Sequence, residues 1–198
     1  MLIPRIFQIF DSALPIGSFN YSSGIEEAYY RGYNIENFIY TVFNNVILKG
    51  DTVAVIKSFK DPYYMDELVY ASKLTNELRE MTTNMGRSLA SLDLCQDDFI
   101  RNVKEGKTYG TYPVVVARIC KCLGISEDDC AIGLTYSEAS LLVFSAVRLG
   151  AISYYRGQEI LSTLLNRIEI HEEFEPFDPI LDILSKSHEK REPKVFMS

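Results

Sequence analysis

The amino-acid sequence predicts an all-α fold, a single-domain helical bundle of about seven to nine helices. Apolar residues recur with helical spacing along most of the chain, and no run shows the period of two expected of a β-strand. Pro, Asn, Asp and Ser residues stand where these periodic segments begin, as they do at helix starts. The 198 residues, 47% of them apolar, are enough to bury one core without a metal or a disulfide.

Three helices are expected in the first half of the chain. One begins near residues 22–23, after a turn. A second follows Asn34, its predicted N-cap, because apolar residues recur at i, i+3, i+4 and i+7 over Ile35–Ile47. The third begins at Pro62, and its apolar spacing predicts one long helix into the low nineties. Gly86 weakens this helix by about 1 kcal/mol relative to Ala, unless close packing against a neighbour requires a missing side chain.

The segment Pro113–Gly124 is also predicted to be helical. Its valines, Val114–Val116, favour a strand locally, but the alternation that follows does not keep a period of two. Pro113 fits the first turn of a helix, and Gly124 fits the position past its end. Ser126 with Asp129 three residues later resembles a capping box, which predicts that a further helical stretch begins there.

The remaining helices are predicted near the C-terminal end. Glu138–Leu149 is apolar on all sides, as expected of a helix in the centre of the domain. Two more helices are expected, one over Gly157–Ile168 and one from Pro179. The acidic segment Glu172–Pro179 contains two prolines and is predicted to be the loop between them.

Arg148 is unusual because it lies inside the most apolar of these helices. A guanidinium there must reach the surface along its stem or meet a partner, since an unpaired buried charge costs several kcal/mol. Glu138 lies on roughly the opposite side of the same helix. We therefore expect the partner of Arg148 to come from elsewhere in the fold.

Composition excludes several classes of protein. A formal net charge of −7 argues against a nucleic-acid binder, which needs an excess of Lys and Arg. The longest uncharged run, Ser12–Ile25, has 14 residues with a proline and two glycines, too short and too broken to span a membrane. Asp11 interrupts the apolar start Leu2–Phe10, so no signal peptide is indicated. We expect a cytoplasmic protein whose four cysteines are reduced thiols.

No catalytic motif is present in the sequence. Nucleophile elbows, phosphate-binding loops, dinucleotide fingerprints and zinc-protease motifs are all missing. The alternative is a metal- or thiol-dependent enzyme that uses Cys120, Cys122 or His171. However, cysteines two residues apart on a helix point to different sides, and buried core cysteines are common. We therefore expect no catalytic residue, no metal ligand and no cofactor.

The two ends of the chain carry the features that suggest binding. We expect one domain over residues 1–198, with a docking N-terminal segment (1–24) and an exposed C-terminal tail (189–198). The N-terminal segment combines a shaped turn with Leu14, Ile16, Phe19 and Tyr21. It is either a packed connector or a surface that docks another protein through exposed aromatic side chains. The tail is polar, but Val195 and Phe196 give it an apolar part near its end.

Residues Phe10–Glu27 resemble the N-terminal signature of the urease accessory protein UreF family. That signature reads Ser-Ala-Leu-Pro-(Val/Ile)-Gly-Ser-(Phe/Tyr), followed by Ser-x-Gly-(Leu/Ile)-Glu. Further blocks agree in the same order: Glu77-Leu78-Arg79 with Gly86-Arg87, Ala146-Val147-Arg148-Leu149 with Gly157-Gln158, and Leu181-Asp182-Ile183 through His188-Glu189 to Lys194-Val195-Phe196-Met197-Ser198. Together these blocks cover the chain from end to end.

The resemblance implies an all-α, non-enzymatic maturation factor. It implies a homodimer that binds UreD (also called UreH) and the GTPase UreG, and an assembly that inserts nickel into the urease apoprotein and modulates GTP hydrolysis by UreG. Nickel would be handled by the complex rather than held as a cofactor. Neither nucleic acid nor a membrane is expected as a partner.

The resemblance also implies a set of partner-binding residues. Phe19 and Lys194 occupy positions where the family places contacts that organise the surface for UreG and UreD. We expect Phe19 to anchor the tail, with Phe196 nearby and Lys194 paired with an acidic group. The full set is Leu14, Pro15, Gly17, Phe19, Tyr21, Glu26, Arg148, His188, Lys194 and Phe196. Lys194 stands where the family has Arg, so the bidentate fork of Arg is missing there.

Overall fold

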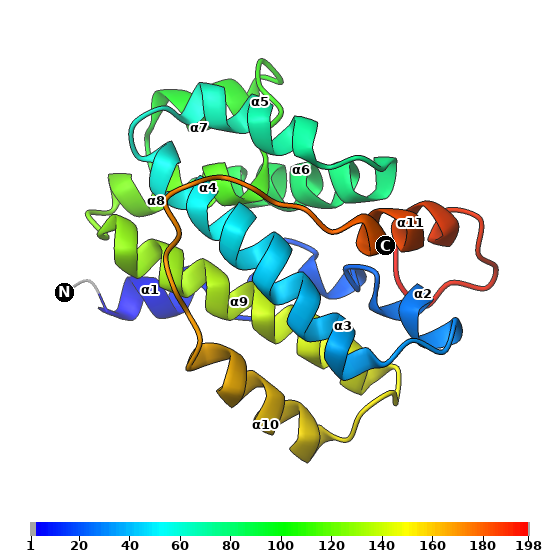
Figure 1. The fold of residues 1–198 in the computed structure, drawn as a ribbon. Coiled ribbons are helices and arrows are strands. Elements are labelled where there is room, and N and C mark those ends of the chain that lie inside the picture. Colours follow the sequence, from blue (N-terminus) through cyan, green and yellow to red (C-terminus); the bar gives the residue numbers. More distant parts are fainter. Residues whose placement is uncertain (1–2, 198) are drawn as a thin grey trace.

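The computed structural model describes residues 3–197, and every regular element in that part of the chain is a helix (Figure 1). The elements are α1 (Ile3–Ile9), the 3₁₀ turn η1 (Ser18–Asn20), α2 (Ile25–Tyr30), α3 (Ile35–Val42), the π-helix η2 (Phe43–Thr52), α4 (Val53–Ser58), α5 (Pro62–Ser72), α6 (Asn76–Ala90), α7 (Asp98–Lys104), α8 (Tyr112–Cys122), α9 (Glu127–Arg148), α10 (Tyr154–Leu165) and α11 (Pro179–His188). Because α3, η2 and α4 run on as one helix, the described residues form ten helices. The all-α prediction is confirmed. The first two residues of the N-terminal segment and the last residue of the tail lie outside the described part.

Helix α9 lies at the centre of the fold, as its apolar sequence predicts (Figure 1). It packs against α8, α10, η2, α4 and α2. Two clusters of buried apolar side chains adjoin it, one built mainly on α4 to α8 and the other on α2, α3, η2, α10 and α11. The predicted helix start is confirmed, since Ser126 Oγ accepts a hydrogen bond from Asp129 N at 3.1 Å and donates one to Asp129 Oδ2 at 2.7 Å. The two predicted segments, from Ser126 and over Glu138–Leu149, are thus one helix of 22 residues.

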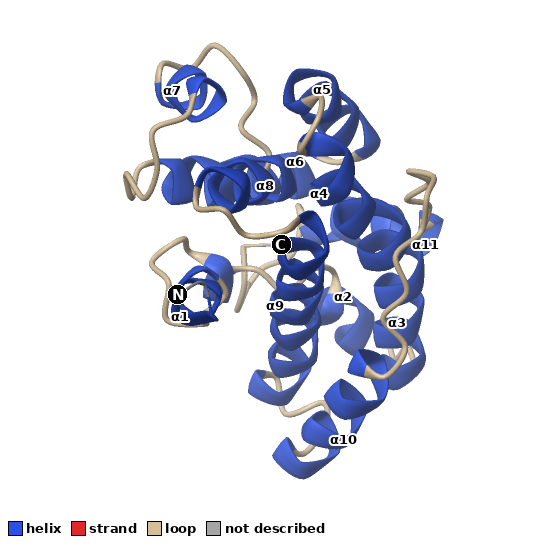
Figure 2. Cartoon of the chain, turned by 90° about the vertical axis from the view of Figure 1, so that its left-hand side faces the viewer, coloured by secondary structure: helices blue, strands red, loops and turns tan. Residues whose placement is uncertain are grey.

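One flank of α9 is not covered by the rest of the fold. Helix α1 lies beside α9 (Figure 2). Ile132 and Tyr136 of α9 are 46% and 44% exposed, and together with residues of α1 they line a groove of about 980 Å³. Among the described residues, α9 is also the one helix long and apolar enough to cross a membrane. In the sequence this helix does not stand out as a long uncharged run, because Glu138 lies in the middle of its apolar residues. However, 56% of that apolar window is buried inside the fold, as a central helix requires.

The predicted long helix from Pro62 is wrong, because the chain breaks between α5 and α6. Lys73 has an extended backbone (ψ 104°), and its ammonium forms a buried ion pair with Asp51 at 3.0 Å. Thr75 then caps α6 by accepting a hydrogen bond from Leu78 N at 3.3 Å. The break therefore depends on a carboxylate from η2, far away in the sequence. The apolar spacing carries across it unchanged, so the periodicity could not reveal it.

The other helix boundaries follow local capping signals. Asn34 Oδ1 accepts from Asn37 N at 2.9 Å, so the predicted N-cap is confirmed, although the helix continues well beyond Ile47. Helix α8 has its proline in the first turn and Gly124 past its end at φ 76°, as predicted. Helix α10 begins three residues before the predicted start, because Ser153 caps it. Helix α11 begins at Pro179 after the predicted loop.

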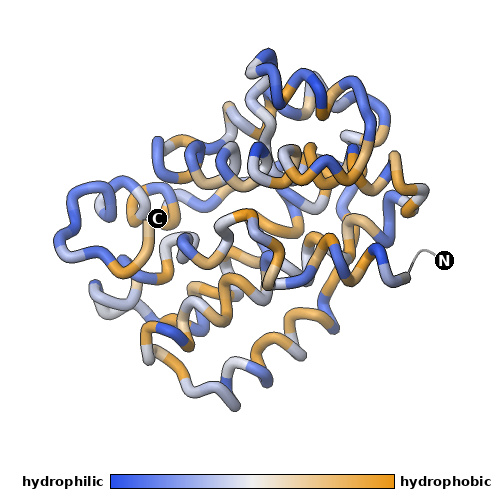
Figure 3. Tube along the Cα trace, turned by 180° about the vertical axis from the view of Figure 1, so that it is seen from behind, coloured by the Kyte–Doolittle hydropathy of each residue, from blue (hydrophilic) through white to orange (hydrophobic). Residues whose placement is uncertain are grey.

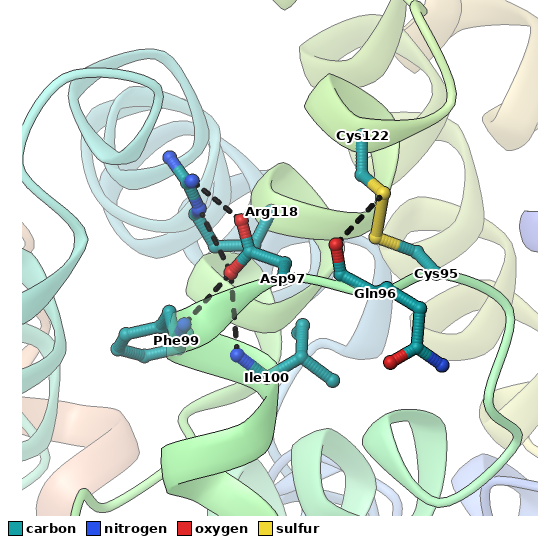
Figure 4. The surroundings of a disulfide bond; sticks show 7 residues. All are labelled: Cys95, Gln96, Asp97, Phe99, Ile100, Arg118 and Cys122. Carbon is teal, nitrogen blue, oxygen red and sulfur yellow. Dashed lines mark hydrogen bonds and ion pairs between the residues drawn. A yellow bond between two sulfur atoms is a disulfide. The ribbon is translucent and has the colours of Figure 1, made fainter.

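Two of the four cysteines form a disulfide, so the expectation of four reduced thiols is wrong. Cys95, between α6 and α7, is bonded to Cys122 at the end of α8 (Figure 4). Beside it, Asp97 caps α7 and pairs with Arg118 of α8 at 2.6 Å. The bond joins two segments whose proximity the sequence pattern does not indicate. Cys120 and Cys130 are free and buried, as expected of core cysteines.

Gly86 allows α6 to approach the turn before α8. A Cβ atom at this position would lie 2.0 Å from the carbonyl oxygen of Gly110. That turn cannot move easily, because the buried carboxylate of Asp66 accepts hydrogen bonds from Gly110 N at 3.0 Å and Thr111 N at 2.7 Å. The close packing that would justify a glycine inside the helix is therefore present.

We predict that Gly86→Ala destabilises the fold. Overpacking costs about 1–3 kcal/mol, which outweighs the helix propensity of about 1 kcal/mol gained by Ala. Urea unfolding measures the change. Glu80→Ala, at an exposed position of the same helix, is the control and should stay within about 0.5 kcal/mol of the parent. A Gly86→Ala protein as stable as the parent would show that the turn yields.

We also predict that reduction of the Cys95–Cys122 disulfide lowers the free energy of unfolding without abolishing the fold. The bond closes a loop with a sequence separation of 27 residues, and a loop of this size is worth about 3–4 kcal/mol in the chain-entropy model. Denaturant unfolding with and without reductant measures the loss. The Cys95→Ser/Cys122→Ser protein should match the reduced parent and should not respond to reductant. A reductant effect that persists in this double variant would contradict the assignment.

Candidate functional site

The N-terminal turn presents Phe19 to solvent. Gly17 adopts a left-handed conformation (φ 78°) just before η1, and Phe19 in η1 is 50% exposed. On either side of it, Ile16 and Tyr21 are each 5% exposed and belong to the core. The turn is therefore a packed connector that also exposes one aromatic side chain. Both structures considered from the sequence are present in part.

The start of α2 is set by two consecutive left-handed residues, Ser23 (φ 52°) and Gly24 (φ 82°). The helix accordingly begins at Ile25 rather than at the predicted residues 22–23. A Cβ atom on Gly24 would lie 2.7 Å from Leu181 Cδ1 of α11, so a glycine is needed there for space as well as for conformation. This close approach brings α2 against α11 and places Glu26 in the interior.

The C-terminal tail returns to this N-terminal turn. It is hydrophilic after α11 and becomes hydrophobic just before its end (Figure 3). Most tail residues are exposed, as predicted, but Phe196 is only 5% exposed and the segment is anchored. Val195 N and Phe196 N donate hydrogen bonds to the carboxylate of Glu26, each at 2.9 Å, and Met197 N donates to Asn20 O at 2.7 Å. The expectation of an exposed tail therefore needs correction: its end packs against residues far away in the sequence.

Arg148 joins the two ends of the chain. Its Nη1 donates to the carbonyl oxygen of Phe19 at 2.7 Å. Its guanidinium carbon lies 5.2 Å from the ring centre of Phe19 and 4.5 Å from that of Phe196, within the range of cation–π interactions. Burial lowers the pKa of Arg148, but an arginine stays charged in a protein. As expected, Arg148 finds its partners elsewhere in the fold: the carbonyl oxygen of Phe19 and the rings of Phe19 and Phe196.

A buried group of charged side chains lies beneath the place where the tail meets the N-terminal turn. His188, the last residue of α11, is fully buried between two carboxylates. Its Nε2 lies 3.1 Å from Glu26 Oε2, and its Nδ1 lies 3.0 Å from Glu77 Oε2 of α6. Lys194 Nζ donates to Glu77 Oε1 at 2.9 Å, so the predicted pairing of Lys194 with an acidic group is present. We call these four residues, Glu26, Glu77, His188 and Lys194, the charge cluster.

A second ion pair holds the start of the tail. Arg191 Nε donates to Glu27 Oε2 at 2.6 Å, and Arg31 Nε donates to Glu27 Oε1 at 2.6 Å. Burial by itself would raise the pKa of Glu27, but hydrogen bonds and charge from the two arginines lower it below its usual value. Glu27 is therefore held as an anion, and this pair stabilises the folded chain until acid protonates the carboxylate.

The structure divides the predicted partner-binding residues into two groups. Pro15, Gly17, Phe19, Arg148 and Lys194 are exposed, and Leu14 is half-buried against the core. The others are buried: Tyr21, Glu26, His188 and Phe196. In this conformation they can support the exposed residues from below, but a partner cannot contact them directly. Sequence reasoning did not assign Glu77, Glu27 or Arg191. Glu77 stands in one of the blocks shared with the family, but its sequence position gives no sign that it meets the tail.

The two cysteines named for an alternative enzyme, Cys120 and Cys122, are not exposed free thiols. Cys120 is buried, and Cys122 is held in the disulfide rather than available as a thiol. Burial raises the pKa of the neighbouring Cys130 thiol well above its usual value, which makes it unreactive. Within the described residues, no group of three or more His, Cys, Asp or Glu side chains is arranged to hold a metal ion.

We predict that Glu26→Gln releases the end of the tail. The Gln side chain keeps the shape of Glu but carries no charge. Its NH₂ group replaces one acceptor oxygen, and a backbone N–H of the tail would then face a second donor and lose its hydrogen bond. Hydrogen bonds to charged groups are worth about 1.5–3 kcal/mol each. Hydrogen exchange at the amides of Val195 and Phe196 should therefore accelerate. Glu36→Gln, which changes a carboxylate paired with the exposed Arg156, should leave these amides protected. Unchanged protection in Glu26→Gln would mean that other contacts hold the tail.

Comparisons with known proteins give the family of the chain. Residues 33–165 match the UreF family model. The urease accessory protein UreF of Yersinia enterocolitica serotype O:8 / biotype 1B is 26% identical over 219 residues, which cover 97% of this chain and 96% of the relative. The protein of the same name from Yersinia pestis (strain Pestoides F) is 27% identical over 226 residues, with the same coverage of both chains. The chain belongs to the UreF family of urease accessory proteins.

Proposed function

We propose that this protein is a urease maturation adaptor. In this proposal it assembles with UreD/UreH and the GTPase UreG, helps to insert nickel into the urease apoprotein, and modulates GTP hydrolysis by UreG. Its family supports a role as a urease accessory protein. The named partners are those that the family resemblance implies. The observation that carries the proposal is that the two ends of the chain meet on Arg148 and form one composite surface.

The composite surface has the properties of a protein-docking site. We define it as Phe19, Arg148, Lys194, Val195 and Met197. Phe19, Val195 and Met197 are 50%, 63% and 57% exposed, and they stand beside two cationic side chains. Exposed apolar groups next to Arg are typical of interface hot spots. Supporting contacts beneath the surface fix its shape, which lowers the cost of ordering it on binding.

Glu26 belongs to the predicted partner-binding residues, but its buried position excludes direct contact with a partner in this conformation. With none of its side chain exposed, Glu26 cannot contact UreG in this conformation. We propose that it influences GTP hydrolysis indirectly, because it holds the tail in the composite surface. Nickel is the cargo of the proposed assembly, and no residue of this chain is proposed as its resident ligand.

We propose a homodimer, which light scattering on the purified chain measures, and the open groove between α1 and α9 offers apolar surface for such contacts. We also propose a cytoplasmic location. Disulfides are uncommon in that compartment, and beside the Cys95–Cys122 bond the Arg118–Asp97 ion pair also links α8 to the start of α7.

We predict that loss of the tail or of the Phe19 side chain weakens assembly. A tagged chain truncated before Lys190 and a full-length Phe19→Ala protein should both capture less UreD and UreG than the parent. Loss of a hot-spot side chain costs about 2 kcal/mol or more of binding free energy. Co-purification and light scattering in GTP and in GDP measure the complexes, and phosphate release by UreG measures the effect on hydrolysis.

Phe177→Ala is a matched control for this experiment. Phe177 is also an exposed phenylalanine, at 72%, but it lies in the loop between α10 and α11. Its removal should leave capture of UreD and UreG unchanged. If the truncated chain captured both partners as well as the full-length protein, the proposed role of the composite surface would fail.

A further inference from the structure

We propose that His188 is a proton-dependent clasp for the C-terminal tail: its imidazolium form, held between Glu26 and Glu77, keeps the tail docked, and loss of its proton releases the tail. His188 would thus be a positioning residue, which acts through the two carboxylates. This inference concerns the chain alone and does not depend on which partners it binds.

The hydrogen bonds of the cluster require both carboxylates to be acceptors. Each oxygen of Glu26 accepts a backbone N–H from the tail, Oε1 from Val195 and Oε2 from Phe196, both at 2.9 Å. Glu77 Oε1 accepts from the ammonium of Lys194 at 2.9 Å. Backbone amides and an ammonium can only donate. The donors around them therefore favour the ionised form of both carboxyl groups.

The geometry around His188 then decides its protonation. Nε2 lies 3.1 Å from Glu26 Oε2, and Nδ1 lies 3.1 and 3.0 Å from the two oxygens of Glu77. A neutral imidazole carries one N–H, so one of its nitrogens would direct a lone pair at an anion. The imidazolium can donate from both nitrogens, so each of the two carboxylates accepts a hydrogen bond from the ring. Docked geometry therefore selects the doubly protonated ring.

Charge balance supports the same assignment. Helix α2 contributes Glu26, α6 contributes Glu77, and the tail contributes Lys194. Within residues 3–197, these are the charged groups with a hydrogen bond or ion pair to His188 or to its two carboxylates. The adjacent Glu27 is already paired with Arg191 and Arg31. With His188 protonated, two anions and two cations balance. With His188 neutral, one buried negative charge would be left uncompensated, which is strongly unfavourable.

The direction of the pH dependence follows from this linkage. Docking of the tail requires the proton on His188, so a rise in pH favours the released tail. The sequence offers a matched control, because its other histidine, His171, lies in the loop between α10 and α11. It also offers a clean reporter, because the chain contains no tryptophan. In the Phe196→Trp protein, the indole is a good replacement for the ring on Arg148, since Trp is the best cation–π acceptor.

The experiment titrates the tryptophan emission of the full-length Phe196→Trp protein from about pH 6 to about pH 9, a range in which histidines lose their charge. We expect emission typical of a buried indole at low pH and of a solvated indole at high pH. The ratio of released to docked tail should rise about ten- to hundredfold, the factor that corresponds to one hydrogen bond between charged groups. His171→Gln added to the reporter protein should keep this transition, and His188→Gln should abolish it.

A flat titration of the reporter protein, or a transition that persists in His188→Gln, would overturn the proposal. If His188→Gln does not fold, as judged by circular dichroism, the ¹⁵N spectrum of the imidazoles in the otherwise unaltered protein decides. It should show His188 protonated on both nitrogens while the amides of Val195 and Phe196 are protected. A ring with a single proton in the docked state would refute the clasp.

Discussion

The buried carboxylate of Glu26 is the group on which the arrangement of both chain ends depends. Its side chain is fully removed from solvent, and a buried carboxylate is tolerated only where donors surround it. Those donors come from His188 at the end of α11 and from the amides of the tail. The left-handed pair Ser23–Gly24 fixes where α2 begins and lets α11 approach. A local backbone feature near the N-terminus thereby determines where the last residues of the chain must lie.

Arg148 performs the complementary task at the surface. It is the last residue of α9, where a cation is favoured by the helix dipole. From there its planar guanidinium contacts the rings of Phe19 and Phe196 and a backbone carbonyl of the N-terminal turn. A lysine ammonium could not stack on two rings in this way. The apolar sequence around Arg148 indicated that a partner was needed, and the partner proves to be the two chain ends together.

The parts of the fold that the sequence predicts are those with local causes. Asn34, Ser126 and Pro179 mark helix starts correctly, because an N-cap or a first-turn proline acts within one turn of the helix. The break at Lys73 and the disulfide of Cys95 could not be predicted in the same way. Each depends on a partner brought close only by the fold, Asp51 for one and Cys122 for the other.

The same distinction applies to the candidate site. The resemblance to a known family indicated that Phe19, Phe196 and Lys194 belong together, and periodicity would not have done so. Glu77 and Arg191 were missed, because a carboxylate on a helix and an arginine in a polar tail are usually solvated. Their roles come from contacts across more than a hundred residues of sequence, Glu77 with Lys194 and Arg191 with Glu27. Only the folded chain shows these pairs.

The balance of forces on the tail shows why the charges matter more than its apolar end. Ordering the backbone costs about 1–2 kcal/mol for each residue. The buried ring of Phe196 returns only about 1.5–3 kcal/mol, and Val195 and Met197 remain mostly exposed. The rest must come from charge-assisted hydrogen bonds to Glu26, Glu77 and Glu27. Docking of the tail is therefore a local equilibrium, separate from the stability of the core. A binding partner that contacts only the composite surface would still respond to the ionisation state of the buried groups beneath it.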